Sequence, residues 1–332
     1  MTRFKALRVH AQDKSTVARF EQLGLDDLSP GDVVVRVAWT GINYKDALAV
    51  TGKGRILKGY PKVPGIDLAG TVESSADARY KPGDPVLVTG CNIGEALDGG
   101  YAEVARLPAS ILVPLPHNLS LREAMAIGTA GFTAALALRR MLENHQSPDM
   151  GPIAITGPTG GVGSIAIDLF KRAGFTVHAI TGKAGAADAY LKALGADQIV
   201  ARQSLEMGKR PLESALWGGA VDNLGGETLA WLTRTTRPWG NIASIGLAQS
   251  HELQTTVMPF ILRGVSLLGI HSVECPRPWR EELWARLSGE WKPRMLDRLV
   301  TREITLEDLP AACEDLIAGT VQGRTLVRVA GG

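Results

Sequence analysis

The sequence predicts an α/β protein in which a doubly wound parallel sheet follows a smaller, β-rich domain. From Gly151 onward, apolar strand-like runs alternate with helical stretches, which is the pattern of a parallel sheet with helices on both faces. Before Ser120, closely spaced strand-like runs are separated by Gly and Pro turns, as in a partly closed antiparallel domain. The length of 332 residues suits two domains of ordinary size.

Composition and charge indicate a globular protein and exclude several classes of function. The chain is 45% hydrophobic and 21% charged, and its formal net charge is only +2. Nucleic-acid binding is not expected, because it would need a strong basic excess. No run of about 18 apolar residues predicts a membrane span, and the first residues lack the apolar core of a secretory signal. We therefore expect a cytoplasmic protein.

The three cysteines, Cys91, Cys275 and Cys313, lie far apart in the sequence. Neither a disulfide framework nor a four-cysteine zinc site is therefore expected. The six histidines are scattered as well, and no Ser, His and Asp set of a hydrolase is recognisable.

The first part of the chain reads as strands joined by tight turns. A β-rich run starts at Asp32, and Pro82, Gly83 and Asp84 predict a turn between two later runs. The predicted strands cover residues 32–43, 65–74, 84–90, 101–108 and 111–116. This spacing predicts the partly closed antiparallel sheet.

The rest of the chain alternates between helix and strand. A long helix is predicted over 120–142, with Ser120 as its N-cap and Glu123 three residues later. Parallel strands are predicted at 152–156, 175–180, 197–200, 219–223, 241–246 and 265–270. Helices are predicted at 162–174, 186–195, 227–236, 257–264 and 278–291. A final helix, Gly turn and strand should return the chain to the first domain.

This return makes the first domain discontinuous. We expect it to comprise residues 1–122 and 271–332, and the parallel-sheet domain to comprise residues 123–270. The last run of the parallel sheet, Val265 to Ile270, is apolar and lies at its edge. An exposed edge strand favours pairing, so we expect a homodimer formed through this strand.

A glycine-rich turn connects the first parallel strand to its helix. The stretch Ala154 to Ser164 reads AITGPTGGVGS. Glycines at such a place make a tight turn and let backbone N–H groups approach a pyrophosphate. The predicted cofactor contacts in this turn are Thr159, Gly160, Gly161 and Val162. The alternative is an ordinary strand-to-helix turn without a ligand, which does not need so many glycines.

The end of the next strand favours NADPH over NADH. An NAD site usually has a carboxylate there for the ribose 2′-hydroxyl, whereas this chain has Thr181, Gly182 and Lys183. A hydroxyl and a lysine suit the 2′-phosphate of NADPH, and Arg202 after the following strand adds a second cation. The alternative is that Lys183 is a solvated surface lysine.

Several motifs resemble one known family in order and spacing. They are IGTAGFTA, TGPTGGVGS, VDNLGG, TTVMPFILRGVSLLGIHSV and VQGRTLV, and above all NYKDALAVTGKGRILKGYPKVPGIDLAGTV from Asn43 to Val72. The whole chain resembles the medium-chain dehydrogenase/reductase superfamily, in its zinc-free, quinone-oxidoreductase-like branch, and is similar to the NADPH-dependent acrylyl-CoA reductase group. The resemblance implies a GroES-like catalytic domain beside a Rossmann domain.

The resemblance also implies that this chain has no metal site. Asn43 stands where zinc alcohol dehydrogenases have a cysteine ligand, Ile66 stands where they have a histidine, and the cysteine-rich zinc lobe is missing. Without a Lewis acid, the acceptor must already be activated. An α,β-unsaturated acyl-CoA qualifies, and acrylyl-CoA reduced to propionyl-CoA is the expected reaction. A quinone or enone acceptor is the alternative, and a dinucleotide-binding protein without turnover is a third hypothesis.

The resemblance further suggests residues at the reacting centre. Tyr44 is the first candidate for a polar group at the nicotinamide and the substrate, although it could simply pack, and Asn43 is a second donor. Thr129 would face the nicotinamide, or be an ordinary helix hydroxyl. The resemblance places Leu247, Ile261 and Ser272 along the cofactor and Arg324 near its phosphates, unless Arg324 is a surface cation.

Two aspartates and a basic loop complete the candidates. Asp46 could orient a neighbour or start a helix, and Asp67 is interpreted as structural. The loop after this helix offers Lys53, Arg55, Lys58 and Lys62 to the phosphates of coenzyme A. The alternative is a solvated charged loop.

Overall fold

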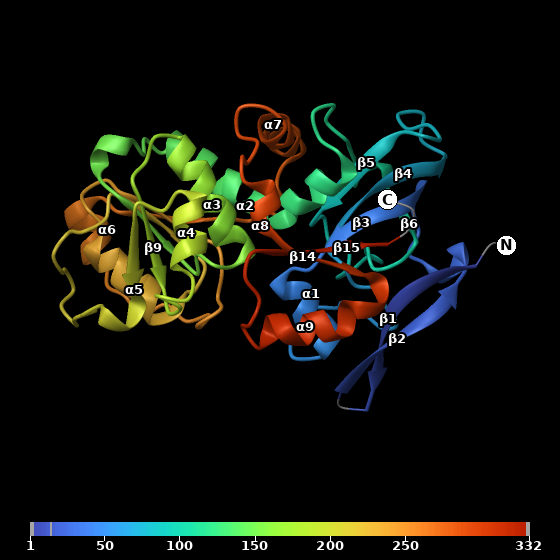
Figure 1. Cartoon of the computed structure of the whole chain (residues 1–332), viewed down its shortest axis with the longest axis horizontal. Coiled ribbons are helices and arrows are strands. Elements are labelled where there is room, and N and C mark those ends of the chain that lie inside the picture. Colours follow the sequence, from blue (N-terminus) through green and yellow to red (C-terminus); the bar gives the residue numbers. More distant parts are fainter. Residues whose placement is uncertain (1–2, 14, 330–332) are drawn as a thin grey trace. The chain divides into compact units, whose positions relative to one another are not determined.

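The computed structural model describes residues 3–13 and 15–329 of the chain, which divide into two compact units (Figure 1). Unit 1 contains the described residues up to Thr129, Val273–Gly289, and those from Leu299 onward. Unit 2 contains Ala130–Ser272 and Glu290–Arg298. The predicted domain ranges differ from these units at 123–129, 271–272 and 290–298, and they remain a prediction.

Unit 1 is built on a seven-stranded sheet. Its order is β14-β15-β3-β4-β5-β7, and β6 also pairs with β3. The strands are β3 (Val33–Gly41), β4 (Asp67–Ser75), β5 (Pro85–Thr89), β6 (Val104–Leu107), β7 (Val113–Pro114), β14 (Val300–Thr305) and β15 (Arg324–Arg328). All pairs are antiparallel except β14 with β15. As predicted, the C-terminal strand returns to the first part of the chain, because β15 pairs with β3.

Strand β3 forms the centre of this sheet. Val33, Val35 and Val37 alternate along one face and are fully buried, which is the period of two that a half-buried strand requires. They share a core with Leu68 on β4 and Leu107 on β6. This core fixes the register of the strands whose ends carry the candidate residues.

Helices α1 (Tyr44–Thr51) and α9 (Leu309–Ile317) pack against each other in unit 1. In Figure 1 the blue α1 and the red α9 lie side by side, although they come from opposite ends of the chain. Ala47 and Val50 share a core with Leu309 and Cys313. Strands β1 (Phe4–Gln12) and β2 (Ser15–Leu23) form a separate antiparallel pair, and α7 (Arg277–Leu287) completes the main elements of the unit.

Unit 2 is the predicted doubly wound sheet. Six parallel strands run in the order β10-β9-β8-β11-β12-β13. Their bounds are β8 (Ile153–Thr156), β9 (Val177–Thr181), β10 (Gln198–Ala201), β11 (Gly219–Asp222), β12 (Asn241–Ser244) and β13 (Ser266–Gly269). The order reverses between β8 and β11, and ligands of such sheets bind at the carboxyl ends beside this reversal.

Helices surround this sheet (Figure 1). They are α3 (Gly161–Arg172), α4 (Asp188–Leu194), α5 (Gly226–Thr235) and α6 (Met258–Arg263). Helix α3 packs on β8 and β9 and also contacts α4. Among the helices of residues 3–13 and 15–329, none combines the length and the apolar character that a membrane crossing requires.

The long helix α2 (Leu121–Glu143) starts as predicted but is interrupted. Ser120 and Glu123 form a capping box, in which the Ser120 N–H donates to Glu123 over 2.8 Å and the Glu123 N–H donates to the Ser120 hydroxyl over 3.1 Å. Gly128 then leaves the helical conformation, with φ 51° and ψ −162°. A new helical segment therefore begins at Thr129, and its first N–H groups need partners outside the helix.

Candidate active site and cofactor site

The glycine turn of unit 2 between Thr156 and Gly161 forms the pyrophosphate cradle, a segment whose backbone suits an anion. Gly157 has φ +56°, and its carbonyl accepts the N–H of Gly160 over 3.1 Å. A Cβ on Gly163 would lie 2.3 Å from the Gly157 oxygen, so only glycine lets α3 approach the turn this closely. Helix α3 begins at Gly161, and the first N–H groups of a helix have no partner within it. This geometry fits the pyrophosphate of a dinucleotide.

Two hydroxyls, from α3 and α4, connect these helices to the turn by hydrogen bonds. The buried Ser164 of α3 donates its hydroxyl hydrogen to the carbonyl of Pro158 over 3.1 Å. Tyr190 of α4 donates to the Ser164 hydroxyl over 3.0 Å. Thr159, a predicted contact, is also buried, whereas Gly160 is exposed at the N-cap of α3.

The residues predicted for the 2′-phosphate lie together at the ends of two paired strands. Thr181 ends β9, and its hydroxyl accepts the N–H of Lys183 over 3.0 Å. Residue 181 pairs with Ala201, so Arg202 follows at the same edge. A Cβ on Gly182 would lie 3.6 Å from Nη2 of Arg202. This edge of the sheet therefore carries the buried hydroxyl of Thr181 and the two basic residues Lys183 and Arg202, and positions 182 and 183 hold no carboxylate.

Sequence reasoning missed a polar group at the reversal of the strand order. Asn223 follows β11 and donates to the carbonyl of Thr156 over 2.7 Å. The Thr156 hydroxyl donates to the buried Asp222 over 2.7 Å and accepts the Asn223 N–H over 2.9 Å. These bonds tie the ends of β8 and β11 together next to Gly157. The dipeptide of Asp222 and Asn223 after a buried strand was the available signal.

The other predicted cofactor residues of unit 2 lie farther along the chain. Leu247 follows β12 and Ile261 lies on α6, and both side chains are exposed, Ile261 by 71%. Ser272 accepts a hydrogen bond from Thr133 over 2.9 Å. The role of these three residues along the cofactor remains a prediction.

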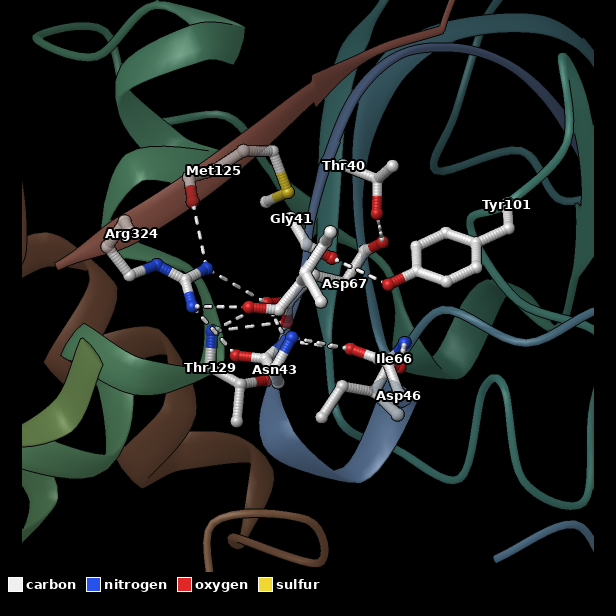
Figure 2. A network of polar contacts seen from close by, with 11 residues as sticks. Thr40, Gly41, Asn43, Asp46, Ile66, Asp67, Tyr101, Met125, Thr129 and Arg324 are labelled. Atoms are coloured by element: carbon white, nitrogen blue, oxygen red, sulfur yellow. Dashed lines mark hydrogen bonds and ion pairs between the residues drawn. The ribbon is translucent and has the colours of Figure 1, made fainter. Parts of the chain in front are cut away.

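In unit 1, Asn43 lies at the centre of a polar network (Figure 2). Its side-chain nitrogen donates to Asp67 over 2.8 Å and to Asp46 over 3.1 Å. Its side-chain oxygen accepts from Arg324 over 2.9 Å. Both amide hydrogens are therefore used by carboxylates, and the geometry does not favour the predicted role of Asn43 as a donor to the substrate.

Asp67 links this network to the interruption of α2. One of its oxygens accepts the Thr129 hydroxyl over 2.6 Å, and both lie 3.1 Å from the Thr129 N–H. The carboxylate thus caps the helical segment that begins after Gly128. The same carboxylate also accepts from Asn43 and lies 3.6 Å from the guanidinium of Arg324. Asp67 is structural, as predicted, and it also orients the hydroxyl of Thr129.

Arg324 begins β15 and is only 2% exposed. Besides Asn43 and Asp67, it donates to the carbonyls of Ile42 and Met125, each over 3.3 Å. The alternative of a surface cation is wrong, because the guanidinium is enclosed by these acceptors. Its predicted role at the cofactor phosphates is not favoured by this geometry.

Asp46 is fully buried and serves both of its predicted alternatives. It accepts the backbone N–H of Asn43 over 2.9 Å at the start of α1, and its second oxygen accepts the N–H of Ile66 over 2.9 Å. Burial and the neighbouring carboxylate of Asp67 raise the pKa of Asp46 to about 7, against the hydrogen bonds that lower it. Of the two buried carboxylates, only that of Asp67 is ion-paired with the guanidinium of Arg324.

Tyr44 is the first residue of α1 and is 45% exposed, so it is not a packing residue of the core. Asn43 precedes it as the N-cap. The basic loop that follows α1 is exposed as well. Lys53 forms an ion pair with Glu314 at 2.7 Å, and Lys58 donates to Asn92 over 3.3 Å.

The structure thus brings the candidates together within each unit. In unit 1, Asn43, Asp46, Asp67, Thr129 and Arg324 form one network with Tyr44 at its margin. In unit 2, the glycine turn and the Thr181 to Lys183 edge each form a compact group. Within residues 3–13 and 15–329, no three His, Cys, Asp or Glu side chains are grouped as a metal site would require.

Comparison with known proteins identifies both parts of the chain. The family described as "Alcohol dehydrogenase GroES-like domain" matches residues 29–117, and "Zinc-binding dehydrogenase" matches residues 161–289. The chain is 46% identical over 329 residues to the acrylyl-CoA reductase AcuI of Ruegeria pomeroyi, covering 98% of this chain and 99% of the relative. It is 45% identical over 329 residues, 99% of each chain, to the putative quinone oxidoreductase YhfP of Bacillus subtilis.

Solved structures are similar over the same length. The yhdH oxidoreductase of Salmonella enterica in complex with NADP is 45% identical, with a TM-score of 0.94 over 98% of this chain and 100% of that one. The yhfP protein of Bacillus subtilis with NAD bound is 44% identical, with a TM-score of 0.95 over 99% and 100%. These similarities confirm the predicted fold class, a Rossmann sheet with a GroES-like domain.

Proposed function

The chain belongs to the medium-chain dehydrogenase/reductase superfamily, and from this premise we propose that it reduces the C=C bond of a short α,β-unsaturated acyl-CoA with NADPH. Acrylyl-CoA is the proposed substrate and propionyl-CoA the product. The observation that carries the proposal is the likeness to the acrylyl-CoA reductase of Ruegeria pomeroyi, which extends over 98% of the chain.

The cofactor site of unit 2 supports NADPH. Gly157 and Gly163 shape the turn so that backbone N–H groups can approach a pyrophosphate. A side chain at either position would be strained or would collide. Lys183 and Arg202 offer charge to a 2′-phosphate, and the hydroxyl of Thr181 holds the backbone of Lys183 in place. We propose Thr159, Gly160, Gly161 and Val162 as further contacts, with Leu247, Ile261 and Ser272 along the rest of the cofactor.

The bound NADPH would supply the hydride for the β-carbon of the substrate, and a proton added at the α-carbon would complete the reduction. We propose that the exposed phenol of Tyr44 donates a hydrogen bond to the thioester oxygen, where negative charge develops. The Thr129 hydroxyl gives its hydrogen to Asp67, so it offers only acceptor lone pairs to the nicotinamide. Asn43 and Arg324 act indirectly, because they hold Asp67 and the start of α1. No zinc takes part in this proposal.

The basic loop of unit 1 supplies candidates for the coenzyme A phosphates. Lys53 is already paired with Glu314, so Arg55 and Lys58 are the stronger candidates. An acyl-CoA should therefore have a lower KM than the same acyl group on a short thiol that lacks the nucleotide.

A quinone or enone reductase is the second candidate function. The similarity to the putative quinone oxidoreductase of Bacillus subtilis favours it, because that likeness is as extensive as the likeness to the acyl-CoA reductase. Both functions share the cofactor residues and differ in the electron acceptor. Binding of NADPH without turnover of any enone would instead support a sensing role.

We also propose a cytoplasmic homodimer formed through β13. This strand is the edge of its sheet, and exposed apolar side chains such as Trp239, Val257 and Leu262 lie on the adjoining segments. A molar mass of one chain by light scattering would contradict the dimer.

The test of function is the oxidation of NADPH with acrylyl-CoA, run beside NADH and beside a simple quinone. Fast turnover with NADPH and acrylyl-CoA alone supports the first proposal. Turnover with the quinone but not with the thioester supports the second. Metal analysis of the active protein should find no stoichiometric zinc.

A further inference from the structure

We propose that Tyr190, acting through Ser164, is a positioning residue that determines the preference for NADPH over NADH. It would do so by joining the two segments that bind the phosphates of the cofactor. The inference depends on the proposed binding of NADPH, and it concerns residues that need not touch the cofactor.

The first step is the relay of hydroxyls between α4 and the glycine turn. Tyr190 donates to Ser164 over 3.0 Å, and Ser164 donates to the carbonyl of Pro158 over 3.1 Å. Ser164 is fully buried, and burial raises the pKa of the Tyr190 phenol. Each hydroxyl has one hydrogen, so the directions of the two bonds are fixed once the carbonyl accepts. Bonds in such a chain strengthen one another.

The second step is that the relay ends on a rigid turn. Pro158 follows Gly157, and a Cβ on the neighbouring Gly163 would lie 2.7 Å from the Cα of Pro158. The turn is thus in contact with α3 on one side and bonded to Ser164 on the other. Any shift of Pro158 would move the Gly157 and Gly160 backbone that shapes the pyrophosphate cradle.

The third step is that α4 is coupled to the segment for the 2′-phosphate. The N–H of Ala187 donates to the carbonyl of Lys183 over 3.0 Å, and the N–H of Gly185 donates to the carboxylate of Asp188 over 2.9 Å. Lys183 is in turn held by Thr181. The position of α4 therefore fixes the position of Lys183, and Tyr190 on α4 fixes both relative to the turn.

The consequence is a selective effect on cofactor binding. The pyrophosphate of NADPH would bind the glycine turn while its 2′-phosphate binds the segment at Lys183. NADH has no 2′-phosphate and would use only the glycine turn. Pre-organisation of two anchors favours the ligand that needs both of them. A tyrosine that merely filled space between α3 and α4 would affect the two cofactors equally.

The experiment measures dissociation constants by fluorescence for NADPH, NADH, adenosine 2′,5′-bisphosphate and AMP. In Tyr190→Phe we expect the Kd of NADPH and of the bisphosphate to rise about fivefold, and that of NADH and AMP less than about twofold. The kcat at saturating NADPH should stay within about twofold. Ser164→Ala should have the same effect, and the double variant should be no worse than either single variant, because all three break one relay.

Tyr80→Phe is the matched control. Tyr80 is buried in unit 1 and donates to the carbonyl of Leu112 over 2.7 Å, so the same chemical change is made away from the cofactor segments. It should leave all four dissociation constants unchanged. Equal weakening of NADPH and NADH in Tyr190→Phe, or no weakening of either, would overturn the inference while NADPH binding stands. Failure of the unaltered protein to bind NADPH would overturn the proposed function itself, and the inference with it.

Discussion

The two regions that carry the candidate residues are stabilised by opposite means. In unit 1, Asp46, Asp67 and Arg324 place three ionisable groups in a fully buried network. In unit 2, the cradle between Thr156 and Gly161 is made of backbone, small residues and hydroxyls. The difference shows which substitution should damage each region. A buried charge is destabilised when its partner is removed, whereas a glycine turn is destabilised when a side chain is added.

The largest expected effect is on the stability of the buried polar network in unit 1. Arg324→Leu would leave the buried carboxylate of Asp67 without its guanidinium and should lower the free energy of unfolding by about 3–5 kcal/mol. Denaturant unfolding measures this change. Arg55→Leu, which removes an exposed cation of the same unit, should change it by less than about 0.5 kcal/mol. Similar stabilities for the two variants would contradict the importance of the buried charge.

In unit 2 the next effect is on binding rather than on folding. Lys183→Ala should weaken NADPH by about 1.5–3 kcal/mol, the value of a hydrogen bond to a charged group, and leave NADH almost unchanged. Titration calorimetry with both cofactors measures the difference. Lys209→Ala is a control, since Lys209 is also exposed in unit 2. An equal loss for both cofactors would contradict a contact of Lys183 with the 2′-phosphate, and no loss for either would leave it a solvated lysine.

The glycine turn can be tested by sterics alone. Gly163→Ala places a Cβ 2.3 Å from the Gly157 oxygen and should cost about 1–3 kcal/mol of stability, with weaker NADPH binding. Gly160→Ala is the matched control in the same turn, because its Cβ would lie at an ordinary 3.5 Å. Thermal unfolding with and without NADPH measures both. Equal unfolding temperatures of the two variants, with and without NADPH, would contradict the steric requirement for glycine at position 163.

A pH-dependent effect on stability is expected from the titration of Asp46. Its pKa is raised to about 7 in the folded chain from an ordinary value near 4, so the native state binds the proton more tightly than the unfolded state. Its stabilising contribution is complete below about pH 4 and is lost as the pH rises through about 7, by at most about 1.4 kcal/mol per pH unit. The stability of the unaltered protein should therefore fall relative to Asp46→Asn over this range. Parallel pH profiles of unfolding would contradict the raised pKa.

The smallest effect is expected on kcat, from a substitution of the exposed Tyr44 beside the buried network. Tyr44→Phe removes one neutral hydrogen-bond donor and should lower kcat about threefold to tenfold with acrylyl-CoA. The KM for NADPH should change little. Tyr60→Phe is a control, because Tyr60 is a similarly exposed tyrosine of unit 1. An unchanged kcat would remove Tyr44 from the reacting centre.

The parallel sheet was predicted more completely than the first unit. All six strands of unit 2 lie close to where their apolar runs predicted them. The four inner strands are mostly buried, and a strand buried on both faces is continuously apolar. In unit 1, helix α1 was only suggested through Asp46, and the pairing of β1 with β2 was not predicted. These elements depend on packing against α9 and on contacts with the end of the chain, which a local pattern does not reveal.

The same reason limits what the sequence revealed about the site. The glycine turn is a continuous stretch, so its role could be predicted from local spacing. The network of Asn43, Asp67, Thr129 and Arg324 joins residues that are up to 281 positions apart. No motif indicates that Asn43 donates both amide hydrogens to carboxylates, or that a break at Gly128 lets Asp67 cap the helical segment beginning at Thr129.

The pairing of β15 with β3 has a consequence for the folding of unit 1. Arg324 meets Asp67 only when β15 docks on β3, and these segments lie far apart in the sequence, so the free-energy cost of closing a long loop falls on unit 1. The sheet of unit 2 is made of strands β8 to β13 and does not include β15. The network around Asp67 therefore depends on a distant segment of the chain, whereas the cofactor segments of unit 2 do not.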